Sequence, residues 1–299
     1  MSEGTDVLRQ LHVSWLRPLV TRHPVATFLL LVYATITVLA FVPVLTEPGL
    51  LPGGATLHGY TENILGVAVP AFVVTAIVGG RDGVRDLAWR CLRWRVPLRW
   101  YAIALLAPPM VLLATVAALY GLDPLGTLVH KWPLLLTSFL PTLVVMVVLN
   151  SVAEEAGFTG FLFARLQDRN GPMRAALLTT VAFWLFHLPG FFLDTGSWAL
   201  TAVLMAFLLL PHLASRLVVG WLYNATGASV LIAGLFHAMH NAMVNPTGLG
   251  VAVLALPQID VLAILAGLVM LAGVIVAAGT RRRLGLRPAL HSRALSPTP

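Results

Sequence analysis

Two adjacent glutamates, Glu154 and Glu155, lie far inside an apolar stretch with the length of a membrane-spanning helix. A charged side chain at the centre of a bilayer costs about 3 kcal/mol even on insertion scales, so such residues are rare and usually face a polar cavity or a partner. Successive helical residues diverge by about 100°. We therefore expect the two carboxylates to face different surroundings, with Glu155 on the line of Thr159, one turn later.

The other ionisable side chains that we single out inside apolar stretches are four histidines: His187, His212, His237 and His240. At about 1.5 Å per helical residue, Glu154 lies about 18 Å from the helix end near Leu166, His187 about 20 Å from the end near Met173 and His237 about 13 Å from the end near Ala228. These are the cytoplasmic ends of the three predicted helices. The sequence therefore predicts that three separate helices place a carboxylate and two imidazoles at similar depth. Asn241, one turn after His237, shares its face.

These groups are the parts of a hydrolytic site. A carboxylate with an imidazole can act as a general base on a water, and a second imidazole with a carboxamide can donate hydrogen bonds to an oxyanion. The same set could instead bind a divalent metal such as zinc through Glu154, His187 and His237, with an open position for water. No His-Glu-x-x-His motif occurs, so the residues alone leave both the metal-bound and the metal-free site open.

Two of the histidines and the cysteine fit structural roles. His240 is expected to pack beside the site. His212 follows Pro211, and we expect it to satisfy backbone carbonyls that the proline kink releases. Cys91 is the only cysteine, which excludes an intrachain disulfide and a cysteine-based metal cluster, and we expect an inert thiol.

The elements that must position the site residues are membrane-spanning helices. Hydrophobic residues make up 58% of the chain and charged residues 10%, against about 25% charged in soluble domains, and the mean hydropathy is +0.87. Apolar runs of about 17 to 25 residues mark such helices. The sequence predicts an all-α polytopic membrane protein with about eight spans, at residues 25–45, 64–79, 102–120, 133–166, 173–188, 198–222, 229–244 and 257–280.

The basic residues follow a regular pattern along these spans. The net charge is +7, but Lys131 is the one basic residue of the loops at 46–63, 121–132, 189–197 and 245–256. The arginines fall in the alternate loops and at the ends, at Arg9, Arg17, Arg22, Arg81, Arg85, Arg90, Arg93, Arg95, Arg99, Arg165, Arg169, Arg174, Arg216, Arg281, Arg282, Arg283, Arg287 and Arg293. The positive-inside rule therefore predicts a cell-membrane protein with both termini cytoplasmic. This placement points to a lipid bilayer, and not to nucleic acid, as the partner of the charges.

One membrane domain accounts for most of the chain. We expect a cytoplasmic N-terminal segment at 1–24, a helical membrane domain at 25–280, and a basic, disordered cytoplasmic tail at 281–299 that touches anionic lipid. Between Arg81 and Arg95, apolar side chains at helical spacing predict an interfacial amphipathic helix. Its apolar face consists of Val84, Leu87, Ala88, Cys91 and Trp94.

Three motifs together resemble a known family. They are Glu-Glu-Ala-Gly-Phe-Thr-Gly-Phe-Leu beginning at Glu154, Phe183-x-x-x-His187-Leu188-Pro189, and His237-x-x-x-Asn241. Their order and intervals resemble those of the CPBP family of CAAX proteases and bacteriocin-processing proteins, also called Abi, which includes the type II CAAX prenyl endopeptidases. The resemblance covers roughly residues 102–244. It implies an eight-helix intramembrane protease with a peptide or membrane-protein substrate, in which a Glu and a His activate water and a His and an Asn form the oxyanion site.

Carried over by motif position, the catalytic residues are Glu154 and His187 for water activation and His237 and Asn241 for the oxyanion, with Glu155 in support. The family's first motif usually continues Glu-Glu-x-x-x-Arg, and the position of that arginine is Thr159 here. The usual charge partner is missing, so Glu155 is expected to be protonated or paired elsewhere. Two other functions stay open: a proton-coupled transporter in which Glu and His form a relay, and a catalytically silent membrane scaffold.

Overall fold

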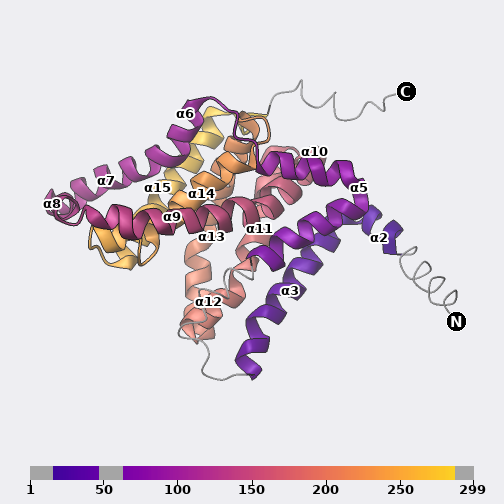
Figure 1. The fold of residues 1–299 in the computed structure, drawn as a ribbon, viewed down its shortest axis with the longest axis horizontal. Helices are drawn as coiled ribbons and strands as arrows, with labels where there is room; N and C mark the ends of the chain where they lie inside the picture. Colours follow the sequence, from indigo (N-terminus) through magenta and orange to yellow (C-terminus); the bar gives the residue numbers. More distant parts are fainter. Residues whose placement is uncertain (1–15, 47–62, 287–299) are drawn as a thin grey trace.

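The computed structural model describes residues 16–46 and 63–286, and every regular element in these ranges is a helix (Figure 1). The predicted terminal segments 1–24 and 281–299 lie partly outside the described residues. The first half of the chain contains α2 (Leu16–Arg22), α3 (Pro24–Thr46), η1 (Ile64–Ala68), α5 (Val69–Cys91), α6 (Leu98–Tyr101), η2 (Ala102–Leu106), α7 (Ala107–Tyr120), α8 (Asp123–His130), η3 (Leu135–Phe139) and α9 (Leu140–Met146). The second half contains η4 (Val147–Glu154), η5 (Ala156–Phe163), α10 (Ala164–Asn170), α11 (Pro172–Phe186), α12 (Leu188–Thr195), α13 (Trp198–Ala225), α14 (Val230–Val244), η6 (Leu249–Val253) and α15 (Gln258–Gly279). Segments labelled η are π-helical.

The all-α polytopic membrane fold is confirmed, and the count of eight spans is not. All eight predicted spans are helical. In the described ranges, six continuous helices are long and apolar enough to cross a membrane, at Pro24–Phe41, Ile64–Cys91, Leu98–Tyr120, Pro172–Thr195, Trp198–Ala225 and Gln258–Gly279. A bent pair, Asp123–His130 with Leu135–Asn150, makes a seventh if it is one span. The predicted span at 229–244 corresponds to α14, which has 15 residues and so falls short of the usual spanning length.

The predicted span at 133–166 is not one regular α-helix. It consists of η3, α9, η4, η5 and the start of α10. The π-helical segments η4 and η5 meet at Glu155, the residue between them. Regions with π-helical turns are rare and often occur at functional sites. The irregular backbone therefore points to Glu154 and Glu155, the residues that the sequence also singles out.

Two glycines of the first motif bring η5 close to its neighbours. A Cβ on Gly157 would lie 3.2 Å from the carbonyl oxygen of Val67 in η1, and one on Gly160 would lie 2.9 Å from Cδ1 of Leu87 in α5. A larger side chain at either position would force the helices apart. Phe158, between these two glycines, is fully buried, and its ring centroid lies 5.2 Å from that of Phe183.

The predicted interfacial helix is the second part of α5. Gly80 has φ 59° and ψ −151°, so it breaks the helix and changes its direction. A side chain other than glycine rarely adopts that backbone conformation. The part after the break ends at Cys91 and not at Arg95. Leu87 and Cys91 of the predicted apolar face are buried, whereas Trp94 is 60% exposed.

Helices α13 and α14 complete the surroundings of the first motif. The 28-residue α13 packs against α11 and α15, and α14 packs against η4 (Figure 1). The start of α14 is fixed by Ser229, whose hydroxyl oxygen accepts a hydrogen bond from the Ile232 amide at 3.3 Å, as expected of an N-cap. This arrangement directs the polar residues of α14 towards the two glutamates.

Candidate active site

The two glutamates and His237 form the centre of a buried polar cluster. The Nδ1 atom of His237 lies 2.8 Å from Oε1 of Glu155 and 3.8 Å from Oε2 of Glu154. All three side chains are buried. The expectation that the carboxylates face different surroundings is therefore wrong, since both approach the same imidazole. The π-helical backbone around Glu155 changes the angular spacing on which that expectation relied. The expected neighbourhood of Glu155 and Thr159 is seen, because the Thr159 hydroxyl donates to Oε2 of Glu155.

Two asparagines connect the cluster into a chain of hydrogen bonds. Nδ2 of Asn150 donates to Oε1 of Glu154 at 3.2 Å, and Oδ1 of Asn150 accepts from Nδ2 of Asn241 at 3.3 Å. Nδ2 of Asn241 also lies 3.2 Å from Nε2 of His237. A donor facing Nε2 requires a lone pair there, so the proton of the neutral imidazole is on Nδ1, directed at Glu155.

Glu155 has a charged partner from another helix. The guanidinium of Arg216, in α13, donates through Nη2 to Oε1 at 2.7 Å and through Nη1 to Oε2 at 3.0 Å. Arg216 is 2% exposed and Glu155 is fully buried. One expectation is corrected here, because Arg216 is not a loop residue facing the cytoplasm. Of the two alternatives expected for Glu155, protonated or paired elsewhere, the structure shows the pairing elsewhere. A buried arginine needs such a partner, because an unpaired charge there is very costly.

His187 lies at the junction of α11 and α12, on the other side of Phe183. Its Nδ1 is 2.8 Å from the carbonyl oxygen of Phe183, to which it donates, so Nε2 carries the lone pair. The Phe183 ring centroid lies 4.6 Å from that of His187 and 5.6 Å from that of His237. Within the described residues, no hydrogen bond or ion pair joins His187 to Glu154. The cluster thus contains four of the five predicted site residues, and the fifth lies one aromatic ring away.

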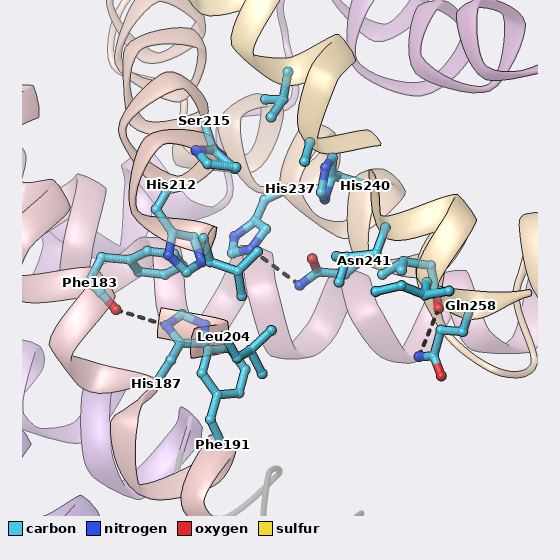
Figure 2. A pocket seen from close by; sticks show the side chains of 17 residues that line it. Phe183, His187, Phe191, Leu204, His212, Ser215, His237, His240, Asn241 and Gln258 are labelled. Atoms are coloured by element: carbon cyan, nitrogen blue, oxygen red, sulfur yellow. Dashed lines mark hydrogen bonds between the residues drawn. The ribbon is translucent and has the colours of Figure 1, made fainter. Parts of the chain in front are cut away.

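His212 stacks on His187, with ring centroids 4.9 Å apart. Its Nδ1 has no hydrogen-bond partner in the part of the chain that the structure describes, so the predicted bond from this atom to a freed carbonyl is not formed. His240 likewise has a buried Nε2 without a partner among those residues. Both imidazoles face the same space as His187 (Figure 2).

That space is a cavity of about 640 Å³ between α11, α12, α13, α14 and α15. Figure 2 shows His187, His212, His237, His240 and Asn241 directed into it from three sides. The rest of its lining is mostly apolar, with residues such as Leu204, Leu208, Ile259 and Leu262. Glu154 and Glu155 are not among the lining residues described. The two glutamates are connected to the cavity through His237 and Asn241, which do line it.

The comparison with known proteins covers this same part of the chain. The family model described as "Type II CAAX prenyl endopeptidase Rce1-like" matches residues 136–243, which run from η3 to α14 and include all five predicted site residues. By this match, residues 136–243 belong to the CAAX protease family. No protein among the curated ones matches the chain. Family membership implies a protease embedded in a lipid bilayer that acts on peptide substrates.

A metal ion held by Glu154, His187 and His237 is the alternative that the sequence leaves open, and the positions of these side chains can be compared with what a metal ion requires. In the described ranges no group of three or more His, Cys, Asp or Glu side chains is placed to hold a metal ion. His237 directs Nδ1 at Glu155 and Nε2 at Asn241, so both nitrogens are engaged within the protein. The set Glu154, His187 and His237 therefore does not fit a metal centre.

Sequence reasoning did not assign Asn150, Arg216 and His212 to this candidate site. Each had a weak signal in the sequence. Asn150 is an amide one turn before Glu154 in an apolar run, Arg216 is a charge inside the span at 198–222, and His212 is an imidazole in the same span. All three follow the rule that a polar group inside a membrane helix faces a partner or a cavity.

Proposed function

We propose that the protein is an intramembrane endopeptidase that hydrolyses a peptide bond of a membrane-associated or prenylated-like peptide or protein. The observation that carries the proposal is the setting of His237. Its Nδ1 is held by Glu155 at 2.8 Å, and its Nε2 faces Asn241 at the wall of a cavity large enough for a peptide segment. A carboxylate that orients an imidazole in this way is a recurring device of hydrolytic sites.

The attacking water is activated by Glu154 and His187. Oε2 of Glu154 has no hydrogen-bond partner in the described part of the chain, and Nε2 of His187 carries a lone pair towards the cavity. Each of these atoms can accept a proton from water as a general base. The water oxygen attacks the carbonyl carbon of the substrate. The proton that it loses is later delivered to the nitrogen of the leaving amine when the C–N bond breaks.

The oxyanion formed in this attack is bound by His237 and Asn241. In the resting state Nδ2 of Asn241 donates to Nε2 of His237. When Nε2 takes up a proton from solvent as the substrate binds, both nitrogens become donors and no longer attract each other. They are then free to donate to the same negatively charged oxygen, and Glu155 and Glu154, at 2.8 and 3.8 Å from Nδ1, stabilise the imidazolium. The proton on Nε2 returns to solvent when the product leaves.

The orientation in the membrane belongs to the same proposal. Both termini and the second half of α5 face the cytoplasm of a cell-membrane protein, and the protease core lies at residues 102–244 within a membrane domain at 25–280. The support is the alternation of basic and non-basic loops.

The test is cleavage of a peptide library by purified protein in detergent, read by mass spectrometry. Glu154→Gln should abolish cleavage, since the amide cannot accept the proton of the attacking water. Asp168→Asn is the matched control, because it makes the same change at an exposed carboxylate of α10. If Glu154→Gln cleaves as well as the parent protein, the protease proposal is wrong, and the transporter and scaffold alternatives return.

A second arm of this experiment adds a metal chelator. The direct attack of water predicts unchanged cleavage. Loss of cleavage with chelator, restored by zinc, would contradict the metal-free site that the described residues fit.

A further inference from the structure

The carboxylate of Glu155 is held by three side chains from three parts of the chain. Oε1 lies 2.7 Å from Nη2 of Arg216 and 2.8 Å from Nδ1 of His237, and Oε2 lies 3.0 Å from Nη1 of Arg216 and accepts from Thr159. The two parallel bonds from the guanidinium fix the plane of the carboxylate. Fixing that plane also fixes the direction in which Oε1 meets the imidazole.

Arg216 also touches the second motif. Its Cζ lies 4.2 Å from the ring centroid of Phe183, a cation–π contact. The carbonyl of the same Phe183 accepts the hydrogen bond that orients His187. Arg216 therefore contacts both Glu155, which orients His237, and Phe183, whose carbonyl orients His187.

Arg216 offsets one of the two carboxylate charges of the cluster. Glu154 and Glu155 are two buried carboxylates within reach of one imidazole. Two like charges so close cannot both persist in a medium of low dielectric without a cation. With Arg216 paired to Glu155, one negative charge remains, on Glu154. That charge can serve as a base, or it can balance an imidazolium at His237.

We propose that Arg216 is a positioning residue of the active site, which supplies from α13 the cation that the first motif of this chain lacks at Thr159. The proposal rests on the proposed function. Thr159 keeps a hydrogen bond to Glu155 but brings no charge, and Arg216 brings the charge from a different helix. Arg216 acts through Glu155 and His237 and does not itself touch the substrate.

The test measures kcat, KM and the melting temperature of variants with a peptide that the parent cleaves. Arg216→Met should lower kcat at least about 100-fold with KM within about threefold, because the oxyanion donors lose their orientation and the binding cavity keeps its lining. Arg216→Lys should give an intermediate kcat, since an ammonium keeps the charge but not the two parallel bonds. Thr159→Arg combined with Arg216→Met should recover at least about tenfold over Arg216→Met, because the cation returns to the same carboxylate from the other helix.

The matched control is Arg165→Met. Arg165 also stacks on a phenylalanine, with Cζ 3.8 Å from the Phe161 centroid, but no carboxylate lies within 4.0 Å of it among the described residues. Its kcat should stay within about threefold of the parent.

Two results would overturn the proposal: a folded Arg216→Met variant with kcat within threefold of the parent, or a folded Thr159→Arg, Arg216→Met variant no better than Arg216→Met. If Arg216→Met does not fold, Glu155→Gln with Arg216→Met removes both charges and leaves no unpaired ion. This pair should melt close to the parent yet lose kcat about 100-fold, and parent-like cleavage would refute the role of the ion pair. An inactive parent would instead mean that the proposed function fails, so the two failures are distinguishable.

Discussion

Asn150 offers the sharpest test of the hydrogen-bonded chain, because it joins the proposed base to the proposed oxyanion site. Asn150→Ala removes the 3.2 Å bond to Glu154 and the 3.3 Å bond from Asn241. A hydrogen bond to a charged group contributes about 1.5–3 kcal/mol, and one between neutral groups about 0.5–1.5 kcal/mol. We therefore expect the variant to lose about 2 to 4.5 kcal/mol of stability.

For the effect on catalysis, we count only the hydrogen bond from Asn150 to Glu154. In the variant, neither oxygen of Glu154 keeps a hydrogen-bond partner among the described residues. If the orientation of this carboxylate is lost, about 1.5–3 kcal/mol of barrier is added, which corresponds to a decrease in kcat of about 10- to 150-fold. KM should change little, because Asn150 is not among the residues that line the cavity.

The assay is steady-state cleavage of one peptide at several concentrations, with thermal melting in the same detergent. Asn170→Ala is the control, since Asn170 is exposed and, among the described residues, its Nδ2 bonds only to the Leu166 carbonyl of its own helix. Cleavage by Asn150→Ala within twofold of the parent would refute the reasoning that this amide orients Glu154.

Three further expectations concern the oxyanion site, the packing and the topology. Asn241→Ala should retain residual activity with kcat lower by about 10² to 10³, the usual cost of one oxyanion donor, and complete loss would indicate a role in water activation. Gly157→Val should lower the melting temperature through about 1–3 kcal/mol of overpacking against η1, and unchanged melting would show that the helices can separate freely. Cysteines at Gly126 and Arg81, in a background without Cys91, should label with impermeant reagent from opposite sides of the membrane, Gly126 from outside, and labelling from the same side would contradict the topology.

The polar members of the site were predictable where the sequence places an ionisable residue in an apolar run. Glu154, His187 and His237 stand out for this reason, and their similar depth follows from helix rise alone. Rise along a helix does not tell which neighbour a side chain faces. For that reason Arg216, at a suitable depth in its own span, could not be assigned to Glu155 without the packing of α13.

The backbone irregularities could not be predicted from the apolar pattern. The span at 133–166 reads as one helix, because a π-helical turn and an α-helical turn accept the same apolar residues. The sequence therefore did not predict that Glu154 and Glu155 both approach His237. Gly80 is different, since a glycine at the boundary between an apolar run and a charged helix is a visible signal for the break in α5.

The residues that line the cavity lie towards one end of the helical bundle. The lining comes from the first half of α15, at Gln258 to Val269, from the last half of α14, and from the start of α12. All three segments lie towards the arginine-poor loops at 189–197 and 245–256. We therefore expect a peptide that arrives from that side to reach the cavity first. In sealed vesicles with uniformly inserted protein, hydrolysis would therefore be vectorial: peptide supplied on the arginine-poor side is consumed, and the same peptide on the other side persists.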